Sequence, residues 1–258
     1  MQVITCDLPR SLTKAEIEVF ADLHIGDNHC DMKLIRERIQ RVAENDHVYC
    51  ILNGDLMNNA TKTSVSDIYT EDIPPMEQIK RCIELFGPIK DKILCITSGN
   101  HEKRTDKKEN IDLTEVMAMQ LGLQDKFSKG ACLLFLRLGD KGKHGHNTQM
   151  RYVIYALHGS GGGRKEGAKA TKLADMAGIV DADIYIHSHT HLPMVIKQAF
   201  YRTDTRNSTV NLVTKLFVNT SAMLDYGGYG EEYEFKPSAK DCPIIHISGT
   251  KREMIARL

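Results

Sequence analysis

Short apolar segments that each end in a polar turn constrain the fold of this chain most. Three such segments are Glu16 to Asp22, Val48 to Leu52 and Ile93 to Thr97. An aspartate, asparagine or glycine stands at the end of each segment or within two residues after it. Segments of this length, alternating or continuously apolar, are typical of β-strands. Between the first two, apolar residues from Met32 to Val42 recur at helical spacing, and Pro75 to Phe86 predicts another helix. This alternation of strands and helices predicts a layered α/β fold.

The second half of the chain is richer in strands. The expected strands are Ala131 to Leu138, Tyr152 to Leu157, Ile184 to His187, Met194 to Tyr201 and Val210 to Val218. Helices are expected at Leu113 to Leu121 and at about Lys165 to Ala177. The polar turn within Thr203 to Ser208 predicts that the last two strands form a β-hairpin.

The length of the chain and the absence of repeats and linkers in its sequence indicate the domain organisation. The chain shows no internal repeat and no Pro- or Ser-rich linker, so we expect one domain over residues 1–258, long enough to bury a sizeable core. Loops are expected at Lys141 to Asn147 and at Tyr226 to Lys236. The apolar tail from Ile244 to Leu258 has two interpretations, a core strand or a surface for a partner. The sequence leaves the oligomeric state open.

Composition excludes several classes of protein. The 34 basic and 34 acidic residues cancel, which argues against binding of nucleic acid or membrane by bulk charge. The seven cysteines are scattered, which favours a reducing compartment over a disulfide framework. No apolar run approaches the roughly 18 residues that span a bilayer, and Met1 to Lys14 lacks the apolar core of a signal peptide. We therefore expect a cytoplasmic protein that is not held to a membrane.

Metal-binding types of side chain gather in five short segments that follow predicted strands. The segments are Asp22-Leu-His24-Ile-Gly26, Asn53-Gly54-Asp55, Ser98-Gly99-Asn100-His101-Glu102, Leu157-His158-Gly159 and His187-Ser-His189-Thr-His191. Singly, each is more typical of an ordinary hydrogen-bonded turn or a solvated loop. Their ordered recurrence at strand ends favours one shared metal site.

The spacing within the segments supports this interpretation. Asp22 and His24 are separated by one residue, so on an extended backbone both side chains project to the same side and reach one cation. The same argument applies to His189 and His191. Glycines such as Gly54 allow tight turns that bring the backbone close to an ion or a phosphate.

In their types and order, these segments make the sequence resemble the calcineurin-like metallophosphoesterase family. The blocks of that family run Asp-x-His, Gly-Asp, Gly-Asn-His-Glu/Asp, His and Gly-His-x-His, and the resemblance covers roughly residues 16 to 195. It implies a four-layer αββα sandwich of two mixed β-sheets, with two metal ions at the carboxyl ends of the strands. It also implies that the first metal is held by Asp22, His24 and His191, the second by Asn100, His158 and His189, and that Asp55 bridges both.

One position departs from the pattern of the family. Ser188 stands where the last block has glycine, which bears on the local turn and leaves the ligands in place. The additional His187 is interpreted as a strand-end residue that supports the ligands and does not bind metal itself.

The ligand types and the family pattern together indicate a reaction. Imidazole, carboxylate and amide ligands favour manganese, iron, zinc or cobalt over magnesium or calcium, and manganese is our leading choice for both ions. Two such ions about 3.5–4 Å apart activate a bridging hydroxide, which attacks phosphorus in line. By resemblance, Asp55 and His101 are catalytic, and His101 stabilises charge on the phosphate or protonates the leaving oxygen. The alternative is that His101 only orients its loop.

Basic residues follow two of the segments. They are Lys103, Arg104, Lys107 and Lys108 after the third segment, and Arg164, Lys165, Lys169 and Lys172 after the fourth. Because both stretches begin at the metal site, Arg104, Arg164 and Lys165 are candidates to bind a nucleic-acid backbone. The Gly-rich turn before Lys165 also offers backbone N–H groups to a phosphate. Neither stretch has aromatic residues between its charges, so a solvated helix face is an equally good interpretation.

The second segment also bears on the substrate. After Asp55 the chain lacks the aspartate and arginine that protein phosphatases of this family carry, which disfavours protein dephosphorylation. The first block resembles the phosphodiesterase and DNA-repair nuclease branches. We therefore expect a dinuclear metal-dependent phosphodiesterase, with a DNA-processing nuclease as the leading hypothesis and a hydrolase of small or cyclic nucleotides as the alternative. A non-catalytic scaffold of the same fold would require lost ligands, and none is lost.

Overall fold

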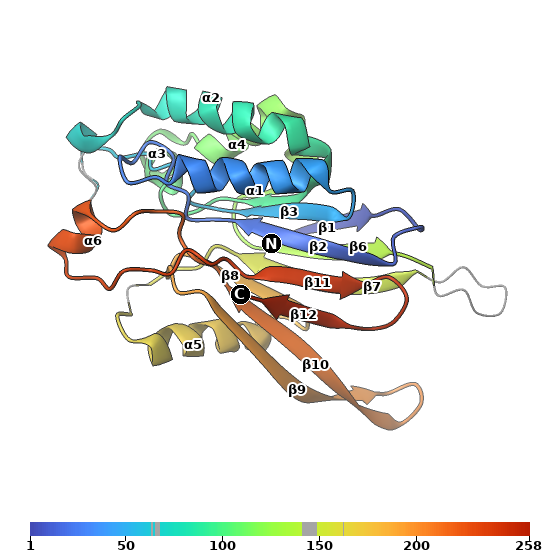
Figure 1. The fold of residues 1–258 in the computed structure, drawn as a ribbon. Helices are drawn as coiled ribbons and strands as arrows, with labels where there is room; N and C mark the ends of the chain where they lie inside the picture. Colours follow the sequence, from blue (N-terminus) through green and yellow to red (C-terminus); the bar gives the residue numbers. More distant parts are fainter. Residues whose placement is uncertain (63, 65–67, 141–148, 162) are drawn as a thin grey trace.

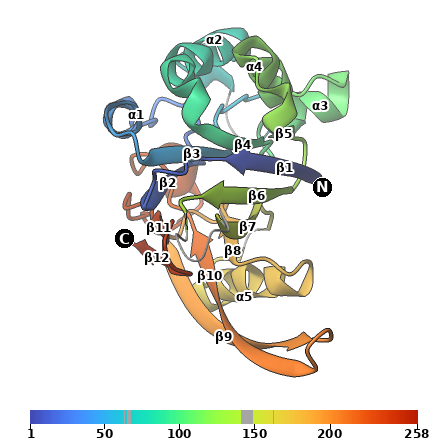
Figure 2. The same cartoon turned by 90° about the vertical axis from the view of Figure 1, so that its right-hand side faces the viewer.

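Two six-stranded mixed β-sheets lie face to face, and helices cover both outer faces (Figures 1 and 2). This architecture is seen in a computed structural model that describes residues 1–62, 64, 68–140, 149–161 and 163–258. It is the four-layer αββα sandwich expected from the sequence. The loop expected at Lys141 to Asn147 lies entirely outside the described residues.

The first sheet has the strand order β12-β11-β2-β3-β4-β5. Its strands are β2 (Lys14–Phe20), β3 (Val48–Asn53), β4 (Ile93–Thr97), β5 (Phe127–Ser128), β11 (Ile244–Ser248) and β12 (Met254–Arg257). Strands β2 to β5 are mutually parallel, whereas β11 is antiparallel to both β2 and β12. The C-terminal tail is thus part of the sheet, which decides between the two interpretations that the sequence left open.

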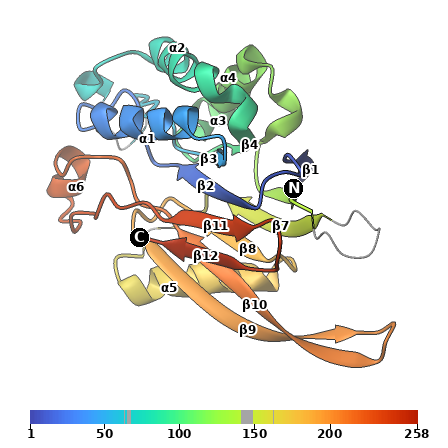
Figure 3. The ribbon, with the colours of Figure 1, turned by 45° about the vertical axis from the view of Figure 1, so that its right-hand side comes forward.

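The second sheet has the order β1-β6-β7-β8-β10-β9. Its strands are β1 (Gln2–Asp7), β6 (Cys132–Leu138), β7 (Met150–Leu157), β8 (Ile184–His187), β9 (Met194–Asp204) and β10 (Thr209–Asn219). Strands β9 and β10 form the expected hairpin, which extends well past β8 (Figure 3). The sequence did not predict β1, because this edge strand buries only Ile4 and so shows no clear apolar pattern.

Helices α1, α2 and α4 cover the first sheet, and α5 covers the second (Figure 2). The helices are α1 (Met32–Glu44), α2 (Pro75–Phe86), α3 (Lys103–Glu109), α4 (Leu113–Leu121), α5 (Glu166–Asp175) and α6 (Gly228–Glu232), with 3-10 turns η1 (Ile68–Thr70), η2 (Gly87–Lys92), η3 (Gln124–Lys126) and η4 (Met176–Gly178). Asp31 and Asp112 cap the N-termini of α1 and α4 through their carboxylates. Over the described residues, no helix is long and apolar enough to cross a membrane.

Three apolar clusters hold the layers together. Ile17 and Ile51 of the first sheet meet Leu136 and Ile154 of the second in the central cluster. A second cluster joins the other face of the first sheet to α1, α2 and α4, and a third joins the second sheet to α5. Both sheets are therefore fixed on two faces, which holds the carboxyl ends of their strands in place.

Two glutamates of β2 are buried between the first sheet and α1. Glu16 and Glu18 alternate with the apolar residues of β2, but α1 covers them and supplies Arg38 and Arg41 as partners. Arg38 Nε donates to the Glu18 carboxylate at 2.7 Å, and the Glu18 side chain is only 1% exposed. A buried charge is tolerated only when it is paired, so this network anchors α1 to the strand that leads to Asp22.

We predict that Glu18→Ala destabilises the protein by about 3–5 kcal/mol, because it removes the partner of a buried guanidinium. Urea denaturation followed by circular dichroism measures the change in the free energy of unfolding. The matched control is Glu37→Ala on the outer face of α1, where the carboxylate is 59% exposed and lies 3.9 Å from Lys33 Nζ. An equal loss in both variants would contradict the assignment.

Candidate metal centre

The five polar segments meet at one end of the sandwich. Parallel strands carry their carboxyl ends to the same edge, so the segments after β2, β3, β4, β7 and β8 are neighbours. Within each sheet, backbone hydrogen bonds join them: Asp22 N–H donates to the carbonyl of Gly54 at 3.1 Å, and Ser188 N–H donates to the carbonyl of His158 at 2.9 Å. Across the two sheets, His189 N–H donates to Asp22 Oδ2 at 2.9 Å. The structure thus brings the five segments together at one end of the sandwich.

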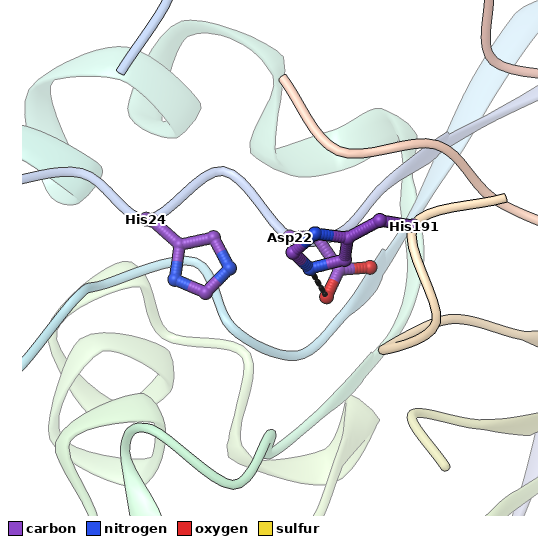
Figure 4. A group of neighbouring side chains, drawn as sticks. All are labelled: Asp22, His24 and His191. Carbon is purple, nitrogen blue, oxygen red and sulfur yellow. Dashed lines mark hydrogen bonds and ion pairs between the residues drawn. The ribbon is translucent and has the colours of Figure 1, made fainter. Parts of the chain in front are cut away.

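The first group of ligand-type side chains consists of Asp22, His24 and His191 (Figure 4). One donor atom of each lies within 4.8 Å of the others. His191 Nε2 is 3.1 Å from Asp22 Oδ1. His24 Nε2 is buried and has no hydrogen-bond partner in the described part of the chain. A buried nitrogen without a partner is costly in a folded protein, so it is suited to a metal.

The second group consists of Asp55, His158 and His189. His158 Nε2 lies 3.1 Å from Asp55 Oδ2 and 3.2 Å from Asn100 Oδ1, so the amide of Asn100 faces this group as expected. A third group contains Asp55 with His24 and His101. Asp55 therefore stands where ligands of the first and second groups meet.

The backbone of these segments differs from the extended form that the spacing argument assumed. Asp22, His24, Asp55, His189 and His191 have positive φ angles of 52°, 49°, 49°, 66° and 53°. Such left-handed conformations cost of order 1–3 kcal/mol each and persist only where the surrounding structure imposes them. The one-residue spacing does bring the ligands together, but through a sequence of tight turns.

Glu102 joins the segments after β3 and β4. Its buried carboxylate accepts N–H groups from Asp55 at 3.1 Å, Leu56 at 2.6 Å, Met57 at 3.0 Å and Gly99 at 3.0 Å. Burial and the neighbouring Asp55 charge raise the pKa of Glu102 to about 7. The sequence analysis included Glu102 in a motif without assigning it a role. The signal was its place in that motif, since its backbone partners are visible only in the fold.

Asn53 supports the fourth and fifth segments. Its carbonyl lies 2.8 Å from His158 Nδ1, and its side-chain amide donates to Ser188 Oγ at 2.7 Å and to the carbonyl of Leu157 at 3.1 Å. Ser188, where the family has glycine, is thus accommodated by a hydrogen bond. The role of Asn53 was also missed, because its partners lie far away in the sequence.

His187 is placed as expected, at the end of β8. Its Nδ1 lies 2.8 Å from Asn219 Oδ1, and it belongs to none of the ligand groups found among the described residues. Asn219 in turn donates to Thr190 Oγ1 at 2.8 Å and to the carbonyl of Leu192 at 2.6 Å. His187 and Asn219 therefore brace the turn that carries His189 and His191.

The charge balance of the site fits divalent cations. Asp22 and Asp55 are almost completely buried, and the ion pairs of both are with histidines. Burial alone would raise the pKa of Asp22 and Asp55, but neighbouring imidazoles outweigh it and lower both. Burial lowers the pKa of His158, yet the Asp55 charge outweighs this effect and raises it to about 10. Two buried anions beside the unpartnered His24 nitrogen make a site that divalent metal ions suit.

His101 and Arg104 form a unit beside the metal-type ligands. His101 Nδ1 lies 2.7 Å from the carbonyl of Asn58 and so donates to it, whereas Arg104 Nη2 lies 3.0 Å from His101 Nε2. Burial and the Arg104 charge lower the pKa of His101, partly offset by the Asp55 carboxylate. Arg104 Nη1 also donates to the carbonyl of Asn58 at 3.1 Å, so this arginine holds the loop as well as the imidazole.

The other two substrate-binding candidates lie on the loop before α5. Arg164 is exposed, and its guanidinium carbon lies 5.1 Å from the centre of the Phe235 ring. Lys165 is exposed at the N-cap of α5. The first residue of α5, Glu166, accepts from Lys236 Nζ at 2.6 Å, so an acid already occupies the helix N-terminus that was expected to face a phosphate.

Comparison with known proteins agrees with this geometry. Residues 23–193 match the family described as calcineurin-like phosphoesterase, and the chain belongs to this family. A family of metal-dependent phosphoesterases accounts for the clusters of metal-type ligands at the strand ends. A comparison with curated proteins found no match.

A comparison with solved structures also found similar chains. They include a predicted phosphoesterase from Streptococcus pneumoniae TIGR4, at 14% identity over 96% of this chain and 100% of that one, with a TM-score of 0.39. Vacuolar Protein Sorting 29 from Cryptosporidium parvum matches at 13% identity over 95% and 97%, with a TM-score of 0.41. Nuclease MPE from Pseudomonas putida matches at 11% identity over 93% and 87%, with a TM-score of 0.36. These scores are too low for the activities of those proteins to bear on this one.

We predict that Glu102→Ala destabilises the protein by at least about 3 kcal/mol, because four buried N–H groups lose their acceptor. Urea denaturation measures this loss. Glu102→Gln keeps one acceptor oxygen and is expected to lie between Glu102→Ala and the wild type. The control is Glu115→Ala on the exposed side of α4, for which we expect little change. Wild-type stability of Glu102→Ala would show that the carboxylate does not hold the two segments together.

Proposed function

We propose that this protein is a dinuclear metal-dependent phosphodiesterase. The observation that carries the proposal is the position of Asp55, whose carboxylate belongs to ligand groups on both sides. One group, with Asp22, His24 and His191, would hold the first ion, and the other, with Asn100, His158 and His189, the second. Every ligand type of the family pattern is present, which argues against a non-catalytic scaffold.

The residues of the chain suit this chemistry. Two divalent ions, for which manganese is our first choice, would supply an activated hydroxide and a clamp for phosphoryl oxygens. His101 lies at the edge of both groups, with its ring centre 4.3 Å from that of His24 and its Nε2 3.9 Å from Asp55 Oδ2. We assign to His101 the contact with the phosphoryl group or the leaving oxygen. Asn58 and Arg104 fix the orientation of its ring.

We predict that His189→Ala and Asp55→Ala abolish manganese-dependent hydrolysis of bis-p-nitrophenyl phosphate, because each removes a ligand. His101→Ala should slow turnover by about 10²–10⁴-fold while the protein still binds manganese, since only the acid or charge-stabilising group is lost. Release of p-nitrophenolate measures turnover, and elemental analysis measures bound metal. His47→Ala, just before β3 and so at the opposite end of that strand from the site, is the matched control and should stay active. Full activity of His189→Ala would refute the ligand assignment.

The leading substrate hypothesis is DNA, which makes the protein a DNA-processing nuclease. Its support is the exposed pair Arg164 and Lys165, which stand at the end of the loop that begins at His158, directly before α5. Arg104 adds positive charge to the site, although it contacts His101 in the structure.

We predict that the manganese-loaded protein cleaves labelled DNA and leaves a panel of cyclic nucleotides largely intact. Gel electrophoresis of end-labelled single- and double-stranded DNA, beside chromatography of the nucleotides, measures both reactions. The matched control is the His189→Ala variant, which should cleave neither substrate. Hydrolysis of the nucleotides without any DNA cleavage, at all manganese concentrations, would end the nuclease proposal and leave the phosphodiesterase proposal standing.

A further inference from the structure

The segment of residues 225–240, which contains α6, contacts one ligand-type residue and the layers on both sides of it. Asp225 N–H donates to the carbonyl of His29 at 2.8 Å, and Ser238 Oγ donates to the carbonyl of the ligand-type residue His191. Lys240 Nζ lies 2.5 Å from the carboxylate of Asp31 at the start of α1. Together with the Lys236 to Glu166 pair on α5, these contacts carry the segment from one outer layer to the other. Figures 1 and 3 show α6 at the end of the sandwich to which β2 points.

This segment presents aromatic side chains. Tyr226 is 50% exposed and Tyr233 is 48% exposed, and Phe235 is half-buried under the guanidinium of Arg164. We call these three residues the aromatic strip. In sequence, the basic stretch after His158 has no aromatic residues between its charges, but the fold places Phe235 of a distant segment beside Arg164. Aromatic rings beside basic side chains are the composition of sites that bind single-stranded nucleic acid, where bases stack on the rings.

The distribution of charge indicates how a single-stranded nucleic acid would lie on this surface. Arg164 and Lys165 are exposed on the loop that carries His158, and Lys169 Nζ donates to the carbonyl of Thr190, between two ligand-type histidines, at 2.7 Å. Lys169 therefore lies beside the turn that carries His189 and His191. The segment itself carries the exposed acids Glu231, Glu232 and Glu234, which repel phosphates. The strip therefore suits the uncharged bases, and the backbone suits the cations.

We propose that the aromatic strip stacks the bases of a single-stranded nucleic acid whose phosphates pass Arg164 and Lys165 toward the metal centre. This inference rests on the proposed phosphodiesterase function and names the form of its substrate. Bases in a duplex already stack and pair with one another, so a duplex cannot offer them to the strip without opening.

The test is binding of fluorescein-labelled strands of about twelve nucleotides, measured by anisotropy with the manganese-loaded protein. One strand is oligo(dT), and the other has abasic tetrahydrofuran residues throughout. Both have phosphorothioate linkages, which resist hydrolysis. We expect the wild type to bind oligo(dT) about ten-fold or more tightly than the abasic strand, because only the former can stack. Equal affinity for the two strands would overturn the inference.

Two variants distinguish the contribution of the bases to the affinity from that of the phosphate backbone. Tyr226→Ala/Tyr233→Ala should lower the affinity for oligo(dT) to near that for the abasic strand. Arg164→Ala should lower the affinities for both strands by similar factors, so that most of the preference for oligo(dT) over the abasic strand remains. This variant serves as an independent test if the double variant fails to fold. Tyr201→Ala removes an 80% exposed tyrosine from the distant β9–β10 hairpin and should match the wild type. A double variant that folds and keeps the full preference for oligo(dT) would refute the role of the strip.

Two further measurements complete the test. A blunt DNA duplex of equal length should compete poorly for the wild type, and competition as strong as that of unlabelled oligo(dT) would overturn the preference for single strands. Hydrolysis of bis-p-nitrophenyl phosphate by the same wild-type preparation reports the proposed function separately. Hydrolysis without a preference for bases refutes only the stacking site, whereas a preference without hydrolysis supports the stacking site and refutes the phosphodiesterase.

Discussion

The buried carboxylate of Glu102 is the interaction on which the geometry of the metal centre depends. It accepts N–H groups from the segment after β3 and from Gly99 in its own segment, so it joins two neighbouring strand ends. Asp55 N–H is one of these donors, and the left-handed backbone of Asp55 is thereby held in place. Four buried N–H groups share the two oxygens of this one carboxyl group, which suits a turn that carries conformational strain.

The ligands assembled by these turns have an excess of buried negative charge. Asp22 and Asp55 are fixed among imidazoles, and the buried nitrogen of His24 has no partner in the part of the chain that the structure describes. Such an arrangement costs free energy in a protein without bound cations, since buried polar groups and charges require partners. The two apolar layers around each sheet supply the stability that keeps this arrangement in place. Membership of the calcineurin-like phosphoesterase family gives the arrangement its chemical context.

Sequence reasoning succeeded where the signal was local. Strands β3 and β4 and helix α2 lie where their apolar patterns placed them, and the β9–β10 hairpin follows from its polar turn. It failed for β1, whose single buried residue gives no pattern, and for α3, which buries no residue. It was also wrong about the backbone between Asp22 and His24, because a positive φ in a non-glycine residue is imposed by tertiary hydrogen bonds.

The sequence by itself determined the ligand types, their order and their positions after strands, since these depend on side-chain chemistry and on short-range patterns. Only the tertiary structure decided which ligands share a group, that Asp55 lies between groups, and that Glu102 and Asn53 brace the turns. It likewise placed Phe235 under Arg164 and Ser238 against His191. The physical reason is that these contacts join residues distant in the chain, and their distances are set by the packing of both sheets and the helices around them.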